Sequence, residues 1–273
     1  MKNNTSKLII TILTITTIIA IILGMYIHVY RGFGGFFFGG SKESVSDTLT
    51  FEGSVSALDL NADFANVTIL PGDGPLTVSY TMPKEMIPDI TFGNGKLIIT
   101  PKKGVFITHF NWNTEYSITV TVPAGTDLTS LKLDSDAGNI SVRDVNAATV
   151  SIEVDAGNVN ISNLTADAFL INSDAGNLLL DKVAATEMTL ETDAGNIDLN
   201  ASNVQTFNVD LDAGNLEIIS SVIDTINADT DMGNIESRDA EIHSGTCTTD
   251  MGDIDLQGNI GDVKVKTSLG KVR

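Results

Sequence analysis

Residues 136–177 read DAGNISVRDVNAATVSIEVDAGNVNISNLTADAFLINSDAGN, and the tetrapeptide Asp-Ala-Gly-Asn occurs in them three times at intervals of nineteen residues. The same interval leads on to two more such copies and to two Asp-Met-Gly variants, before a degenerate Ser-Leu-Gly-Lys copy follows after eighteen residues. The seven full copies begin at Asp136, Asp155, Asp174, Asp193, Asp212, Asp231 and Asp250. A fixed period over seven copies is the sequence signature of a solenoid, in which each repeat is one coil.

Each repeat contains two runs in which apolar and polar residues alternate. One follows the tetrapeptide, as at Ile140 and Val142, and the other precedes the next copy, as at Val150 and Ile152. A period of two is typical of β-strands. A shorter third side is indicated by one further apolar position in each repeat, at Val145, Leu164, Val183, Val204 and Ile223. Residues 131–273 are therefore predicted to form a parallel β-solenoid, right-handed by the usual rule for parallel connections.

Residues 47–130 show the same pattern less regularly. The stretch LDLNADFANVTIL, from Leu58, places Asp63 and Asn66 where the later Asp and Asn stand. Alternating runs with turn signals between them follow at 76–80, 96–100 and 116–122. We expect irregular first coils here that cover one end of the solenoid, because an uncovered end invites further strand pairing.

The repeated tetrapeptide has the composition of a tight turn. Its glycine is suited to a left-handed backbone conformation, its Asp to an Asx hydrogen bond from the turn, and its Asn to amide-to-amide stacking between coils. Stacked Asp side chains would repel one another by roughly 1–3.5 kcal/mol per adjacent pair at effective dielectrics of 80 to 20. Backbone donors would offset this in a structural turn ladder, which is the favoured interpretation. Bound Ca²⁺ is the alternative, because oxygen-rich rows suit that ion.

The N-terminal residues have the composition of a membrane anchor. Residues 8–30 carry no charge and would span roughly 35 Å as a helix, enough to cross a bilayer. A cleaved signal peptide is the competing interpretation, although its apolar region is usually shorter. The prediction is a cytoplasmic tail over 1–7, a single-pass anchor over 8–30, a Gly- and Phe-rich tether over 31–46 and an extracytoplasmic C-terminal domain.

Composition excludes several classes of function. The 273 residues carry a formal charge of −19, from 16 Lys and Arg against 35 Asp and Glu, which disfavours nucleic-acid binding.

Cys247 is the only cysteine, so no intramolecular disulfide can form. It falls at an inward position of the repeat, which predicts burial. His243 has no second His or Cys at metal-ligand spacing.

Outside the repeats, one segment combines aromatic and polar residues. It contains His109, Trp112 and Tyr116, which are candidates for a ligand-contacting loop, with a folded cap as the alternative. A polysaccharide-modifying enzyme would need a local pair of carboxylates in a groove. The carboxylates here recur regularly, as turn residues do. The sequence therefore predicts no catalytic residues and no enzyme.

The repeats and the segments before them resemble a known family. The Asp-Ala-Gly-Asn coils, YSITVTVPAGTDL from Tyr116 and FGNGKLII from Phe92 are similar to the bacterial family of uncharacterised domains known as "putative adhesins". The resemblance covers most of residues 47–273. With its predicted anchor, the whole chain resembles the LiaG type of membrane protein, whose genes accompany a cell-envelope stress-sensing system in Gram-positive bacteria. The resemblance implies an extracytoplasmic β-solenoid with a role in adhesion or envelope stress, and it supplies no catalytic residues.

The leading hypothesis is a non-enzymatic, membrane-tethered solenoid that presents an acidic surface to an envelope partner. That partner would be a wall polymer, a surface ligand or another membrane protein, and no cofactor is expected unless Ca²⁺ binds the Asp row. The alternatives are a polysaccharide-modifying β-helix enzyme and a cation-dependent structural rod.

Overall fold

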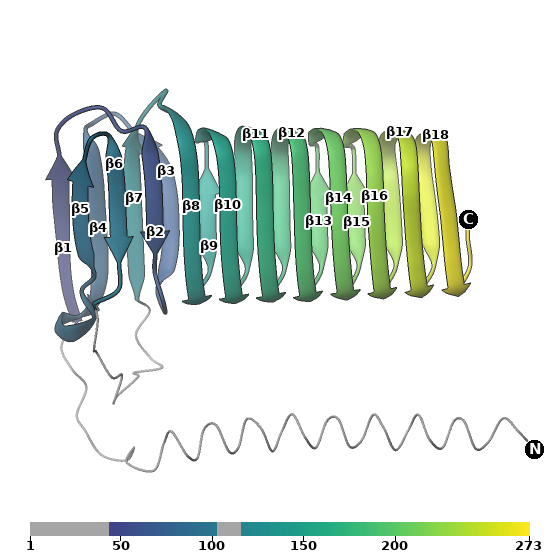
Figure 1. The fold of residues 1–273 in the computed structure, drawn as a ribbon, viewed down its shortest axis with the longest axis horizontal. Coiled ribbons are helices and arrows are strands. Elements are labelled where there is room, and N and C mark those ends of the chain that lie inside the picture. The colour runs from purple at the N-terminus through teal and green to yellow at the C-terminus, as the bar shows by residue number, and fades with distance from the viewer. Residues whose placement is uncertain (1–43, 103–115) are drawn as a thin grey trace, which may run out of the picture. The chain divides into compact units, whose positions relative to one another are not determined.

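The computed structural model describes residues 44–102 and 116–273, which form an all-β solenoid (Figure 1). The predicted tail, the predicted anchor over 8–30 and the tether up to residue 43 lie outside the described residues. Within the described ranges, no helix combines the length and apolar character needed to cross a membrane. The first strand begins at Ser44, inside the predicted tether.

The described residues contain eighteen strands, which belong to one continuous sheet, and a short 3₁₀ helix. The elements are β1 (Ser44–Phe51), β2 (Ala57–Asn61), β3 (Asn66–Gly72), β4 (Leu76–Pro83), η1 (Lys84–Met86), β5 (Asp89–Gly93), β6 (Lys96–Thr100), β7 (Ser117–Pro123), β8 (Asp127–Ala137), β9 (Ile140–Arg143), β10 (Asn146–Ala156), β11 (Val159–Ala175), β12 (Leu178–Ala194), β13 (Ile197–Asn200), β14 (Asn203–Ala213), β15 (Leu216–Ile219), β16 (Val222–Met232), β17 (Ile235–Met251) and β18 (Ile254–Leu269).

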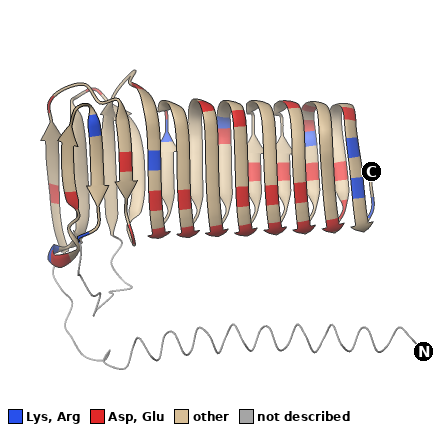
Figure 2. Cartoon of the chain, in the orientation of Figure 1, with Lys and Arg blue, Asp and Glu red and all other residues tan. Residues whose placement is uncertain are grey.

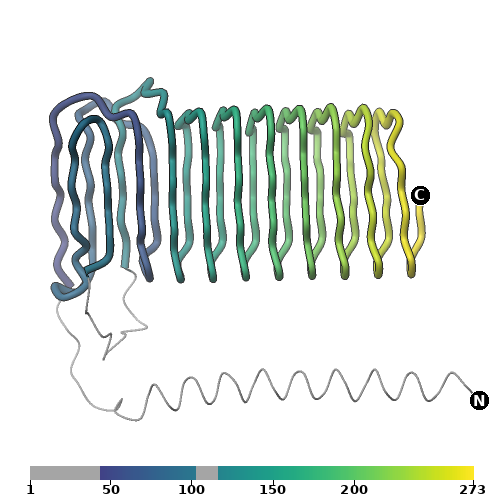
Figure 3. The backbone as a smooth tube through the Cα atoms, in the orientation of Figure 1, coloured from purple at the N-terminus to yellow at the C-terminus, as the bar shows by residue number. Residues whose placement is uncertain are grey.

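The nineteen-residue period is the pairing register of the coils, which confirms the predicted parallel solenoid. Val150 lies beside Phe169 and Ile152 beside Ile171 in the parallel pair β10–β11. We call the strand segments before each glycine turn the long face and the four-residue segments after it the short face. The two faces lie on opposite sides of the solenoid, with β9, β13 and β15 on the short face (Figures 1 and 3).

The core fills the space between the two faces, and the predicted inward positions occupy it. The third-side residues Val145, Leu164, Val183, Val204 and Ile223 are each at most 2% exposed. Cys247 is fully buried in the same inward column as Ala228 and Val209, as predicted. Burial raises the pKa of its thiol to about 12. A thiol with that pKa is a packing group and not a nucleophile.

The N-terminal end differs from a simple stack of coils. β2 and β3 form a first coil as expected, since Asn61 aligns with Asp134 and Val67 with Ile140. However, β1 pairs antiparallel with β4, β4 antiparallel with β7, and β5 antiparallel with β6. The sequence pattern predicted further coils here. Instead, the turns between the short strands reverse the direction of the chain. The resulting antiparallel strands terminate the parallel stack of coils on its N-terminal side.

The turn glycines are required for close stacking more than for a tight turn. Gly195 has φ of +152°, in a region that is essentially restricted to glycine, and not in the αL region near +57° that the turn motif suggested. A Cβ on Gly195 would collide with the carbonyl oxygen of Gly176, one coil earlier. In the regular coils the αL residues lie at the opposite corner instead and are Asp144, Asn163, Lys182, Ala201, Ser220 and Asp239.

We expect Gly195→Ala to destabilise the solenoid by about 1–3 kcal/mol, because the added Cβ forces two coils apart. Chemical denaturation followed by circular dichroism would measure the change. Gly74→Ala is the control, since nothing lies within 4 Å of a Cβ at Gly74. Equal effects of the two substitutions would contradict the role assigned to glycine stacking.

Candidate functional site

A ladder of asparagine side chains runs along the solenoid beside the glycine turns. The backbone N–H of Asn158 donates to Oδ1 of Asn139 at 3.0 Å, and Asn177 donates to Asn158 in the same way. All bonds of this series measure 2.8–3.0 Å, and their acceptors are Asn66, Asn139, Asn158, Asn177, Asn196, Asn215, Asn234 and Asp253. The ladder supplies a partner for one backbone donor in each turn.

Amide-to-amide bonds, which the sequence predicted, occur at two steps of this ladder. Nδ2 of Asn158 donates to Asn139, and Nδ2 of Asn215 donates to Asn196, each at 3.2 Å. In the part of the chain that the structure describes, Nδ2 of Asn177 and Nδ2 of Asn196 donate no hydrogen bond to another side chain. Their N–H groups are therefore available to a ligand.

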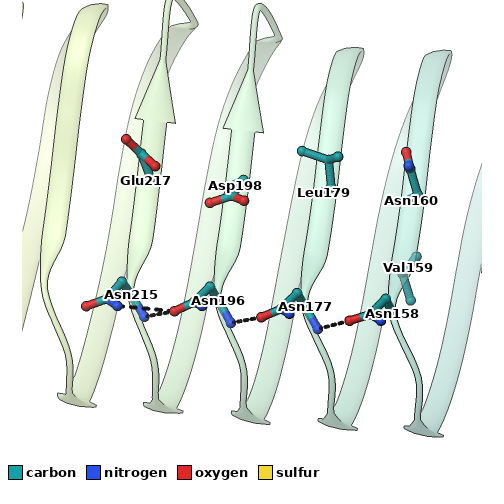
Figure 4. Close-up of a pocket in the computed structure, with 9 residues that line it drawn as sticks. All are labelled: Asn158, Val159, Asn160, Asn177, Leu179, Asn196, Asp198, Asn215 and Glu217. Carbon is teal, nitrogen blue, oxygen red and sulfur yellow. Dashed lines mark hydrogen bonds between the residues drawn. The ribbon is translucent and has the colours of Figure 1, made fainter. Parts of the chain in front are cut away.

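A shallow groove of about 540 Å³ lies on the short face, across β11, β12, β13 and β15. Figure 4 shows two rows of side chains in it, one from the asparagine ladder and one from the outward positions two residues further along each strand. We call this the asparagine groove, and its lining residues are Asn158, Val159, Asn160, Asn177, Leu179, Asn196, Asp198, Asn215 and Glu217.

The second row changes from neutral to acidic along the groove. Asn160 and Leu179 form one end, and Asp198 and Glu217 are adjacent in the parallel register of β13 and β15 at the other. Partial burial, followed by the neighbouring Glu217 charge, raises the pKa of Asp198. Glu217 is bound by Arg238 at 2.6 Å, which balances its charge. The groove thus presents amide donors opposite carboxylate and amide acceptors.

The Asp residues of the turn motif lie on the long face, opposite the short face that carries the asparagine groove. The seven side chains are exposed, and a row of acidic residues follows the edge of the long face (Figure 2). Among the described residues, no turn N–H donates to the carboxylates of Asp155, Asp174 or Asp193. The turn donors bond to backbone carbonyls of the next coil instead, as Gly157 N–H does to Ala175 at 2.9 Å. The predicted Asx bond is therefore replaced by coil-to-coil pairing and by the asparagine ladder.

At the N-terminal end of the Asp row, burial and neighbouring carboxylates raise the pKa of two carboxyls. Partial burial, then Asp155 and Asp134, raise the pKa of Asp136. Asp63 occupies the equivalent position one coil earlier, and burial together with Asp136 and Asp134 raises its pKa too. Over residues 44–102 and 116–273, no three His, Cys, Asp or Glu side chains form a group that could hold a metal ion. Calcium binding by the Asp row stays a prediction.

The other candidate residues do not converge on one site. His109 and Trp112 lie outside the described residues. Tyr116 is only 4% exposed, so its side chain lies in the core and not on a ligand-contacting surface. Exposed His243 bridges Asp224 and Glu241 at 3.0 and 3.1 Å, and the hydrogen bonds that its ring donates to Glu241 and then to Asp224 raise its pKa.

Sequence reasoning missed the asparagine groove, although its first row was visible. The sequence predicts only a stacking role for the fourth residue of each motif. The signal that could have revealed the groove lies two residues later, where Asn160, Leu179, Asp198 and Glu217 occupy successive outward positions. Sequence alone did not show that these two rows border a common hollow.

A family model described as Toastrack DUF4097 matches residues 55–268 of the chain. A solved structure of a "putative adhesin" from Parabacteroides merdae ATCC 43184 is similar, with a TM-score of 0.56 and 13% identity over 86% of this chain and 98% of that chain. Another "putative adhesin", from Parabacteroides distasonis ATCC 8503, has a TM-score of 0.49 and 16% identity over 85% of this chain and 97% of the other. No curated protein matches the chain.

We expect Asp136→Asn to raise the free energy of unfolding at pH 7 by roughly 0.2–1 kcal/mol, the range for like charges on neighbouring strands. A carboxyl whose folded-state pKa is raised stabilises the fold below its ordinary pKa of 3.8, and this contribution is lost as pH rises through the folded-state pKa. The gain should therefore be absent at pH 3. Denaturation at both pH values measures it, with Asp73→Asn in an exposed loop as the control. A gain of equal size at pH 3 would show that charge is not its cause.

Proposed function

The chain belongs to the Toastrack DUF4097 family, and from this membership together with the asparagine groove we propose that it is a non-enzymatic binding protein of the cell envelope. The observation that carries the proposal is the double row of amides and carboxylates along the short face. The ligand would be a hydroxyl-rich polymer, such as a wall glycan, lying along the solenoid.

The chemistry of the groove supports such a ligand. A hydroxyl group both donates and accepts hydrogen bonds. The Nδ2 groups of Asn177 and Asn196 offer donors on one side, and Asp198 offers an acceptor on the other. Leu179 adds an apolar surface beside Asp198 in the second row (Figure 4). Because the coils repeat every 4.7–4.9 Å or so, an asparagine recurs at that spacing along the groove, as a repeating polymer requires, while the second row differs from coil to coil.

The distribution of carboxylates supports binding over catalysis. Glycoside hydrolysis needs one carboxyl that acts as an acid and a second, unpaired carboxylate. Glu217 is paired with Arg238, which also lies 3.5 Å from Glu236. The raised pKa of Asp198 is the one observation that favours the enzyme alternative. Release of soluble sugars from wall material during the binding assay below would support that alternative.

An envelope location is supported by the sequence outside the described residues. The uncharged segment 8–30 has the length of a membrane anchor. The similar structure from Parabacteroides merdae is described as that of an adhesin-type protein, which agrees with a role in attachment. An anchored solenoid would hold the asparagine groove outside the membrane, within reach of wall polymers.

The proposal predicts that the fragment 41–273 co-sediments with isolated cell walls and that Asn177→Asp/Asn196→Asp weakens this binding by about tenfold or more. Each Asp keeps the Oδ1 that accepts the next coil's N–H but removes the Nδ2 donor. The ladder should therefore survive while the ligand loses two hydrogen bonds. Binding isotherms in Ca²⁺ and in EDTA would measure the effect and test cation dependence.

Asn208→Asp is the matched control, since Asn208 lies on the long face and its Oδ1 also accepts a bond, from Asn227 at 2.9 Å. It adds one negative charge outside the groove, against two inside it in the double variant, and should leave binding unchanged. Equal loss in both variants would contradict the assignment of the groove. Binding only to membrane vesicles, abolished by protease treatment, would point to a protein partner instead.

A role in envelope stress makes a separate prediction. Deletion of the gene should change the tolerance of the source cells to wall-targeting agents, because a wall-binding protein would be lost. Growth in a concentration series of several such agents would measure this. A gene encoding Asn177→Asp/Asn196→Asp should fail to complement, whereas Asn208→Asp should complement. Unchanged tolerance to every agent would count against the stress role.

A further inference from the structure

We propose that the C-terminal end of the solenoid is a self-association surface, at which β18 of one copy pairs antiparallel with β18 of a second copy across a two-fold axis. The two solenoids would then join end to end. This inference is independent of the asparagine groove and of its ligand. It rests on the uncovered last coil and on the order of charges along β18.

The last coil leaves inner and corner side chains uncovered in the described structure. Six large apolar side chains are at least 36% exposed among the described residues, and three of them, Val265, Leu269 and Val272, belong to the last coil, with Leu269 the most exposed at 70%. Met232 and Met251 are exposed turn residues of earlier coils that align with Leu269. Val265 continues the inward column of Cys247, which is fully buried one coil earlier. The loss of burial therefore marks the end of the core.

The backbone edge of β18 is also open on the long face. Residues 271–273 cover only the start of the strand, where Lys271 accepts a bond from Ile254 and Val272 bridges to Ile254. On the long face, β17 is the only described strand that pairs with β18. Residues 258–269 thus present unpaired backbone donors and acceptors beside uncovered apolar groups.

An occupant of this surface must supply backbone hydrogen bonds as well as apolar contact. A lipid surface would cover the apolar groups but would leave the strand edge without partners. A β-strand edge satisfies both requirements, as in other cases of edge-to-edge pairing. The occupant that we propose is therefore another strand edge.

The distribution of charge favours a second copy joined at this end. The long face carries two acidic columns, one of them the Asp row and the other passing through Glu153, Glu191 and Asp210. Two such faces repel each other when the solenoids lie side by side. The last coil is different, because Lys264, Lys266, Lys271 and Arg273 lie within its final ten residues (Figure 2).

The outward residues of β18 are self-complementary in one antiparallel register. Asp262 and Lys264 flank Val263 and are both exposed. With the two-fold axis at Val263, each Asp262 lies opposite Lys264 of the partner copy, since an isologous interface makes every contact twice. Lysines on edge strands usually discourage pairing. Here Lys264 opposes a carboxylate in this register, and the lysines would exclude registers in which lysine meets lysine.

Charge exchange at these two positions tests the proposal. The full chain in mild detergent should show a concentration-dependent dimer by light scattering coupled to size exclusion. Lys264→Asp alone and Asp262→Lys alone each create two like-charge contacts and should weaken dimerisation by about tenfold or more. The double exchange Asp262→Lys/Lys264→Asp restores opposite charges and should restore the dimer.

Lys132→Asp is the matched control, because Lys132 lies in the same outward column at the far end of the regular coils. It should leave dimerisation unchanged, and circular dichroism should show that all variants are folded. A monomeric parent chain throughout the concentration series would overturn the proposal. So would single exchanges that dimerise like the parent, or a double exchange that fails to recover.

Discussion

Coils can stack in a nineteen-residue register only if their backbones come close together at each turn. Glycine allows this close approach because it has no side chain. A Cβ at Gly157 or Gly195 would meet the carbonyl oxygen of the glycine one coil earlier. The turn therefore keeps the same residue in every copy, and the register that follows aligns each apolar column into one core. The asparagine ladder, the acidic rows and the groove are consequences of this alignment.

The asparagine beside each glycine links the stability of the turn to the chemistry of the surface. Its Oδ1 accepts the N–H of the next copy, so the acceptor is used within the solenoid. At Asn177 and Asn196 the Nδ2 donor is left over and borders the groove. One side chain can thus hold two coils together and still contact a ligand, because an amide has both an acceptor and donors.

Charge has different consequences on the two faces and at the end of the solenoid. On the long face, acidic columns at coil spacing disfavour contact between parallel solenoids. Partial burial, and then the charges of neighbouring carboxylates in these columns, raise the pKa of Asp136. On the short face, Arg238 balances Glu217 at the acidic end of the groove. Basic residues gather in the last coil, beside its uncovered core.

The sequence by itself determined the solenoid, its register, its inward columns and the burial of Cys247, because a residue that recurs every nineteen positions must occupy equivalent places in a stack. It also located the first coil through Asp63 and Asn66. Tertiary structure alone decided that β1, β4 and β5 run antiparallel, since irregular strands carry no period that specifies direction. It likewise decided that Asn, and not Asp, bonds the turns, and that Asn196 and Asp198 border one groove. Hydrogen-bond partners and surface hollows depend on distances between coils, which a linear pattern does not contain.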